Sequence, residues 1–177
     1  MNRINKFLAI VAAAVCMASC SLIAEDYKEY VANHSNEVVD IDLSGEAETY
    51  NLEIDDFSRI DSRFGIITIE YSQSDAEPMA QLICNNEIMQ IVDIYTKNGT
   101  LHIDPKDNIE ENIRWNISND YECRLICNSK QLKSIKQKGS GDVVLKNGIN
   151  GDNLEINRSG LGDLECLQPL NVKKLHI

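Results

Sequence analysis

The chain has 177 residues, of which 43% are apolar and 25% are charged, and its formal net charge at pH 7 is −11. This length is enough for one domain with a hydrophobic core. The acidic balance argues against nucleic acid as a partner, because nucleic-acid phosphates would be repelled, and against a peripheral grip on anionic lipid.

Residues 1–19 have the features of a secretory signal peptide. Arg3 and Lys6 precede an unbroken apolar run from Phe7 to Val15, which is shorter than the roughly 20 residues that a membrane-spanning helix needs. Met17-Ala-Ser-Cys20 resembles a bacterial lipobox, which implies cleavage before Cys20 and lipid attachment to that cysteine. Several acyl chains would anchor the protein stably. Ordinary signal cleavage, with Cys20 unmodified, is the alternative.

The mature chain is predicted to begin with a tether. Ser21 follows the cysteine, and by analogy with other lipoproteins this residue favours the outer membrane. Residues 20–47 are polar and acidic with few large apolar groups, as expected of a lipidated tether. Residues 48–177 are predicted to form one β-domain.

Short apolar–polar alternations separated by turn residues predict β-strands from residue 50 onward. The predicted strands are Tyr50–Ile54, Ile67–Tyr71, Ala80–Cys84, Ile88–Tyr95, Thr100–Ile103, Ile113–Ile117 and Tyr121–Cys127. Asn98-Gly99 is a strong hairpin signal. Alternation places Trp115 in the core, and the alternative is a sugar-stacking platform of Trp115 with Tyr71, Tyr95 and Tyr121.

The C-terminal part of the chain repeats with a period of 21 residues. Adding 21 takes Ile135 to Ile156 and then to Ile177, and it takes Leu145 to Cys166. A fixed period with glycines and apolar residues in register is typical of coils stacked on copies of themselves. The sequence therefore predicts an all-β solenoid of 21-residue parallel coils, with a less regular N-terminal β portion.

Each of the two copies carries a Gly-x-Gly-Asp corner. The residues of this candidate structural turn motif are Gly139, Gly141, Asp142, Gly160, Gly162 and Asp163. We expect the glycines to occupy tight or positive-φ corners and the aspartates to bond local backbone amides. Calcium binding is the alternative, but each coil supplies one motif aspartate whereas Ca²⁺ takes six to eight oxygens. No metal site and no cofactor is therefore predicted.

Four cysteines lie within the predicted domain: Cys84, Cys123, Cys127 and Cys166. On one strand, Cys123 and Cys127 would be about 13 Å apart, too far for a shared zinc ion or a mutual disulfide. We expect the cysteines to be buried apolar residues. Secretion leaves a disulfide between strands open, and the sequence does not pair them.

Catalytic motifs are missing from the sequence. It contains no Gly-x-Ser-x-Gly elbow, phosphate-binding loop or His-Glu-x-x-His motif, and His34, His102 and His176 are isolated from one another. Parallel β-helices include carbohydrate-active enzymes, but this chain has too few coils to build their cleft. No catalytic residue is predicted, and such an enzyme is the most distant alternative.

A family resemblance is carried by five segments: Phe57–Ile60, Gly65–Ile69, Asn98–Ile103, Leu132–Ile135 and Gly139–Val143. Together they resemble the head GIN domain, the family of "putative autotransporter adhesins" found in secreted proteins and lipoproteins of Bacteroidetes. The most specific piece is Gly-Ser-Gly-Asp preceded by Leu-Lys-Ser-Ile, although Leu161 replaces the usual serine in the second copy. The resemblance covers Phe57 to the last residue. It implies a right-handed parallel β-helix-like fold and an envelope location. Because family members usually carry further coils, we also expect the domain to be truncated at its C-terminus. The alternatives are that the last strand pairs with another molecule or lies at the edge of a smaller sheet.

These features predict a non-enzymatic, lipid-anchored envelope protein whose β-domain is a binding or structural module. Adhesion to glycans or proteins of host or neighbouring cells is the form that the resemblance implies. The alternative is a periplasm-facing scaffold or stress-related lipoprotein whose partner is another envelope protein. The membrane contact is through the lipid anchor, at the cell surface or the periplasmic face, and the oligomeric state is left open.

Overall fold

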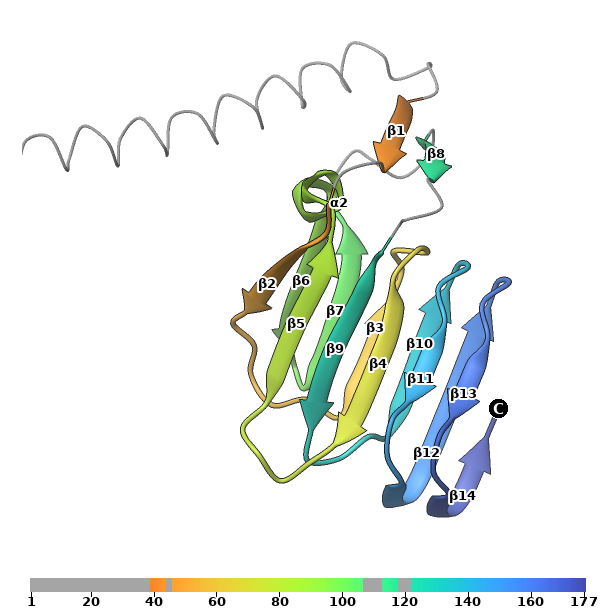
Figure 1. The fold of residues 1–177 in the computed structure, drawn as a ribbon. Coiled ribbons are helices and arrows are strands. Elements are labelled where there is room, and N and C mark those ends of the chain that lie inside the picture. Colours follow the sequence, from red (N-terminus) through yellow and green to blue (C-terminus); the bar gives the residue numbers. More distant parts are fainter. Residues whose placement is uncertain (1–38, 44–45, 107–112, 118–121) are drawn as a thin grey trace, which may run out of the picture. The chain divides into compact units, whose positions relative to one another are not determined.

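The computed structural model describes residues 39–43, 46–106, 113–117 and 122–177, and the fold is given for these ranges (Figure 1). The signal segment, Cys20 and His34 lie outside the described residues. Two compact units divide the chain: residues 41–107 with 115–177, and residues 1–40 with 108–114. The two large sheets and the sites described below belong to the first of these units.

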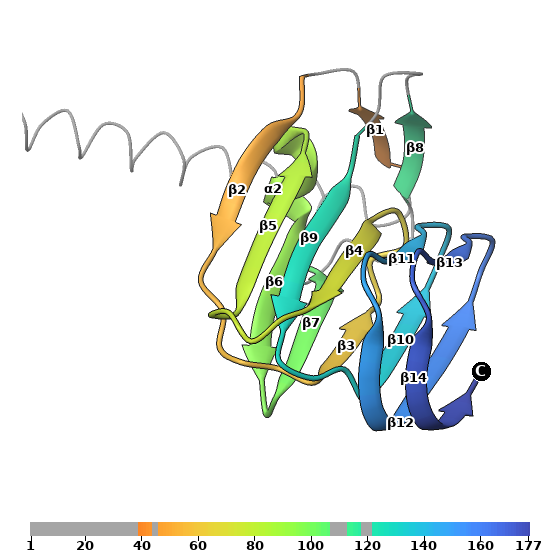
Figure 2. The ribbon, with the colours of Figure 1, turned by 60° about the horizontal axis from the view of Figure 1, so that its bottom comes forward.

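Most described strands form two six-stranded sheets, which face one another (Figures 1 and 2). The first, called the β3 sheet, has the order β14 (Leu170–His176), β12 (Ile149–Ser159), β10 (Ser134–Lys138), β3 (Arg59–Ser62), β7 (Thr100–Pro105) and β6 (Val92–Lys97). The second, called the β4 sheet, has the order β13 (Leu164–Cys166), β11 (Val143–Leu145), β4 (Thr68–Gln73), β9 (Arg124–Ser129), β5 (Met79–Cys84) and β2 (Glu48–Leu52). The remaining strands, β1 (Val39–Leu43) and β8 (Ile113–Ile117), pair with each other.

The predicted parallel β-helix-like solenoid is wrong. Both large sheets are mixed, because β6 is antiparallel to β7 and β5 is antiparallel to β2 and β9, and neither sheet closes on itself. The 21-residue period instead corresponds to the parallel register of three strand pairs: β10 with β12, β12 with β14, and β11 with β13. The repeat therefore corresponds to local strand pairing, whereas the sheets are mixed because of the antiparallel pairs β2–β5, β5–β9 and β6–β7.

The core lies between the two sheets and follows the strand alternation. Ile60, Ile135 and Ile156 are in register on neighbouring strands of the β3 sheet, and Ile69 and Val143 are in register on the β4 sheet. Each of these side chains is 1% exposed or less. Complete burial of an aliphatic side chain of this size stabilises a fold by roughly 1.5–3 kcal/mol, so each residue of these rows contributes to stability.

The strand predicted over Ile88–Tyr95 is wrong in its first half. The structure has a short helix, α2 (Asn86–Ile91), followed by β6. Ile88 and Ile91 are the buried residues of α2, and their spacing of three is helical rather than alternating. Helix α2 carries the chain from β5 in the β4 sheet to β6 in the β3 sheet.

The predicted hairpin at Asn98-Gly99 is confirmed. The φ angles are +51° at Asn98 and +69° at Gly99, as a two-residue type I′ turn requires. The hairpin sets the register of β6 and β7, in which Lys97 is opposite Thr100 and Tyr95 is opposite His102.

Candidate functional site

Three strand-to-strand turns lie against one another, and the first glycine of each Gly-x-Gly-Asp corner lies within this stack. Gly139 and Gly160 have φ angles of +113° and +141°. A Cβ added to Gly139 would lie 2.1 Å from the Cα of Gly65, and one added to Gly160 would lie 1.8 Å from the carbonyl oxygen of Gly139. Both the backbone conformation and the close approach of the turns therefore require glycine.

The second glycine of each corner is needed for a different reason. A Cβ on Gly141 would lie 2.1 Å from the carbonyl oxygen of Ile67, and one on Gly162 would lie 2.1 Å from the carbonyl oxygen of Gly141. Asp142 joins the same stack, because its Oδ1 accepts a 2.7 Å hydrogen bond from the backbone amide of Asp163. The motif therefore has a structural role, because its glycines allow the backbones of the stacked turns to approach closely.

Metal binding and membrane spanning find no support within the described ranges. No group of three or more His, Cys, Asp or Glu side chains gathers there in a way that could hold a metal ion. Over the same ranges, none of the helices is sufficiently long and apolar to cross a bilayer.

The cysteines differ in their surroundings. Cys84, Cys123 and Cys127 are buried, as predicted, whereas Cys166 is exposed, so the prediction is wrong there. Burial raises the pKa of the Cys84 and Cys127 thiols to about 12. A thiol that stays protonated is a poor nucleophile, which argues against a catalytic role for either residue.

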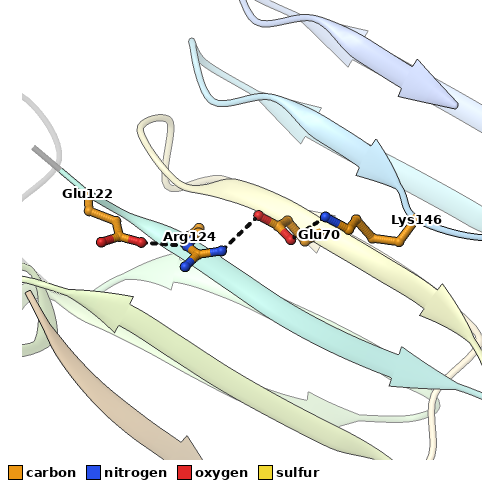
Figure 3. Close-up of polar contacts among 4 residues, drawn as sticks. All are labelled: Glu70, Glu122, Arg124 and Lys146. Carbon is orange, nitrogen blue, oxygen red and sulfur yellow. Dashed lines mark hydrogen bonds and ion pairs between the residues drawn. The ribbon is translucent and has the colours of Figure 1, made fainter. Parts of the chain in front are cut away.

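The outer face of the β4 sheet carries a ladder of charges (Figure 3). Arg124 lies between two carboxylates, with its Nε 2.6 Å from Oε1 of Glu122 and its Nη1 3.3 Å from Oε1 of Glu70. The Nζ of Lys146 lies 3.0 Å from Oε2 of Glu70. Partial burial acts to raise the pKa of Glu70, but the hydrogen bonds from Lys146 and Arg124 outweigh it, and the pKa lies below its usual value. The two acids and two bases balance one another, so the ladder links β9, β4 and β11 and presents no net charge.

The outer face of the β3 sheet carries a different cluster, which we call the aromatic platform: Tyr95, His102, Asp104 and Arg63. The rings of Tyr95 and His102 are stacked, with centroids 5.0 Å apart and planes 18° apart. Tyr95 is 39% exposed. An exposed tyrosine stacked on a neighbouring ring offers a flat apolar surface to solvent.

Two hydrogen-bonding neighbours fix the carboxylate beside these rings. The Arg63 guanidinium binds Asp104 in bidentate fashion, with Nε–Oδ1 and Nη2–Oδ2 distances of 2.8 Å each. The Tyr95 hydroxyl donates to Oδ2 of Asp104 at 3.0 Å. The hydrogen bonds from Arg63 hold the pKa of Asp104 below its usual value although burial opposes them. The hydrogen bond to Asp104, and then burial, raise the pKa of Tyr95. The platform therefore joins an ionised acid, a partly exposed guanidinium and a neutral phenol.

The platform continues as a row of polar side chains across the β3 sheet. Strand register places Asp61 beside His102, Lys136 beside Asp61, and Asn157 beside Lys136. Lys136 and Asn157 are exposed, and the residues flanking them in sequence are mostly buried. From Tyr95 to Asn157 the row crosses four strand spacings, about 19 Å.

A shallow cavity of about 450 Å³ lies elsewhere on the molecule. Its lining includes two acids and two bases, namely Asp56, Asp75, Lys130 and Lys133. The ring of Phe57, also on its wall, is only 2% exposed. The cavity thus offers mixed charge without an accessible ring, and the platform is the better candidate for a binding site.

Of the four aromatic residues considered for a sugar-stacking platform, the two whose side chains are described differ in exposure. Tyr71 is fully buried and its hydroxyl bonds Ser129, so it is a core residue. The side chain of Trp115 and all of Tyr121 lie outside the described residues. Tyr95 is the exposed member, and its partner His102 was read from the sequence as an isolated histidine. The hairpin at Asn98-Gly99 contained the missing signal, because counting outward from this turn places Tyr95 opposite His102.

Several solved structures share this fold. One is a putative adhesin from Bacteroides fragilis (TM-score 0.65, 28% identity), which covers 76% of this chain and 59% of that chain. Another is a putative adhesin from Parabacteroides merdae (TM-score 0.56, 24% identity), and the match covers 68% of this chain and 47% of that chain. A third is a putative lipid binding protein from Parabacteroides distasonis (TM-score 0.56, 23% identity), and the match covers 73% of this chain and 62% of that chain. The last two, below 25% identity, show the fold alone. The chain spans less than two thirds of the length of each of these structures.

No curated protein matches the chain. Residues 56–177 match the family model described as "Putative auto-transporter adhesin, head GIN domain". This match covers more than half of the sequence and confirms the resemblance seen in the turn motif and its flanking strands. Such a family indicates a protein of the cell envelope or cell surface. The chain belongs to the head GIN domain family of putative auto-transporter adhesins.

Proposed function

We propose that this protein is a non-enzymatic adhesin of the cell envelope that binds a glycan at the aromatic platform. The observation that carries the proposal is the exposed ring of Tyr95, stacked on the half-buried His102 beside the fixed carboxylate of Asp104. Its family and the Bacteroides fragilis structure support adhesion as the general role. The chemistry of the platform supports a glycan as the ligand.

A sugar ring has an apolar C–H face and a rim of hydroxyl groups. The ring of Tyr95 suits the C–H face, because an aromatic side chain combines a large apolar surface with a polar edge. The guanidinium of Arg63, whose side chain is 52% exposed, donates to hydroxyl groups, and the buried carboxylate of Asp104 holds that guanidinium in place. Bonds that involve charged groups are the stronger ones, so this pair would orient the ligand.

The platform is ordered before any ligand arrives. Arg63 and Tyr95 hold Asp104 from two sides, and the side chain of Asp104 is only 7% exposed. A ligand therefore orders few side chains on binding, which lowers the entropic cost of association. The row through Asp61, Lys136 and Asn157 extends the face and suits an elongated glycan rather than a single sugar.

Lipid attachment at Cys20 and exposure on the outer membrane complete the proposal. A tether of residues 20–47 would hold the domain away from the bilayer. Protease shaving and antibody labelling of intact cells test this orientation. Labelling of intact cells supports an adhesin, whereas labelling only after cell lysis would favour the periplasm-facing scaffold. Membrane retention of a Cys20→Ala variant would contradict the anchor.

A glycan array tests the ligand class. Residues 21–177 of the wild type and of Tyr95→Ala are applied at equal concentration, with Tyr50→Ala as the matched control. Tyr50 is a partly exposed tyrosine on the other sheet, and its hydroxyl bonds Glu48. We expect the wild type and Tyr50→Ala to bind the same glycans and Tyr95→Ala to lose them. Wild-type protein that binds no glycan would contradict the proposal.

A further inference from the structure

The register of β5 and β9 brings two cysteines together. These strands are antiparallel, with Met79 opposite Asn128 and Ile83 opposite Arg124. The paired register ends at Ile83 and Arg124, and continuing it by one residue would place Cys84 opposite Cys123, which directly precedes β9. Both cysteines are reduced in the structure. Both side chains are buried, with 0% and 5% exposure, and belong to the alternating set that faces the core.

Directly opposite residues of an antiparallel pair have Cα atoms about 4.5–5.5 Å apart. This separation falls within the range of about 4.4–6.8 Å that disulfides span. The other cysteines are too distant. Cys127 is opposite Ala80, four residues or about 13 Å along the strand from Cys84. Cys166 is on β13, three strands or about 14 Å from β9. Within the β4 sheet, the register therefore singles out one cysteine pair.

We propose that Cys84 and Cys123 form a disulfide in the exported protein. The inference rests on the proposed export of the chain, because disulfides persist in oxidising compartments, and it does not depend on the ligand. Formation joins the two Sγ atoms, and the two thiols lose two protons and two electrons. These pass to the disulfide of an envelope thiol–disulfide oxidoreductase, which becomes a dithiol. Because the thiols are buried in the folded domain, the exchange takes place during folding.

The bond would close the segment that carries Tyr95, His102 and Asp104 of the aromatic platform, whereas Arg63 precedes this segment. After Cys84 the chain leaves the β4 sheet through α2 and forms the β6–β7 hairpin, and at Cys123 it reaches β9 in the β4 sheet again. The disulfide would then link the two ends of this segment within the core. A cross-link of this kind restricts the unfolded chain and limits local opening of the closed segment.

Peptide mapping tests the bond directly. The full chain is exported to the periplasm of a bacterial host, its remaining thiols are alkylated under denaturing conditions, and it is digested with trypsin without reduction. Cleavage after Lys and Arg separates the cysteines, with Cys84 in residues 64–97, Cys123 in 115–124 and Cys127 in 125–130. We expect residues 64–97 to be linked to 115–124. A link to 125–130, or alkylation of both Cys84 and Cys123, would overturn the proposal. The mass of the mature N-terminus reports separately whether export took place.

Thermal unfolding with and without a reducing agent gives a second readout. Reduction should lower the Tm of the wild type and of Cys166→Ser by roughly 10 °C. It should leave the Tm of the double variant Cys84→Ser/Cys123→Ser unchanged. Equal effects of reduction on the wild type and on the double variant would contradict the bond.

Discussion

Gly160 lies directly against Gly139, 21 residues earlier in the chain, so that a Cβ on Gly160 would come within 1.8 Å of the Gly139 carbonyl oxygen. The contact joins the turn between β12 and β13 to the turn between β10 and β11. It explains why the glycines recur with the period of the strand pairs. It also marks the position where the addition of a single methyl group should destabilise the fold most.

Replacement of Gly160 by alanine should lower the free energy of unfolding by roughly 2 kcal/mol or more. The alanine methyl group would collide with backbone, and the φ angle of +141° is strained for any residue with a side chain. The control is Gly151→Ala in β12, the strand that precedes the Gly160 turn, where an added Cβ meets nothing within 4 Å. Chemical denaturation should separate the two variants, and equal stabilities would contradict the stacked-turn account.

Glu70→Gln should destabilise the protein by about 1 kcal/mol, and more than Glu122→Gln does. Glu70 contacts both Arg124 and Lys146 and its side chain is 15% exposed, whereas the ion pair of Glu122 within the described ranges is with Arg124 and its side chain is 43% exposed. Urea denaturation at low and high salt measures the effect. The difference between the variants should shrink with salt, because exposed ion pairs are screened. A difference that does not change with salt would exclude an electrostatic origin.

Asp104 should make the stability of the protein sensitive to acid. Its pKa is lower in the folded protein than in the unfolded chain, chiefly because of the hydrogen bonds from Arg63. The stabilisation is therefore present above the unfolded-state pKa of about 3.9 and is lost as the pH falls through the folded-state value. Denaturation midpoints from pH 7 to pH 2 should fall more steeply below about pH 4 in the wild type than in Asp104→Asn. Asp93→Asn, an exposed carboxylate on β6, should follow the wild type, and parallel curves for all three proteins would refute the role of Asp104.

Strand positions were largely predictable from the sequence, whereas sheet architecture was not. Alternation found residues 67–71, 80–84 and 100–103 because one face of each strand is buried and the other meets solvent. The 21-residue repeat correctly aligned Ile135 with Ile156. It says nothing about the strands outside the repeat, where the antiparallel pairs β2–β5, β5–β9 and β6–β7, together with α2, shape the fold.

The binding site was less predictable than the turns. The turns require glycine for their backbone conformation and close contacts, and this requirement is visible in the sequence as a motif. Tyr95, His102 and Arg63 are brought together by pairing between strands. His102 belongs to no sequence motif, so the sequence around it does not indicate a site. Only the hairpin register relates Tyr95 to His102, and Arg63 directly follows β3, 41 residues before Asp104 in the chain.

Chemical-shift mapping tests the central claim most directly. Isotope-labelled wild-type protein is titrated with the glycan that gives the strongest array signal, with Tyr95→Ala as the comparison. We predict that the largest amide shifts fall on β6, β7 and β3 around Tyr95, His102 and Asp61, and that they vanish in the variant. Shifts centred on the charge ladder around Arg124, or unchanged shifts in Tyr95→Ala, would contradict glycan binding at the aromatic platform.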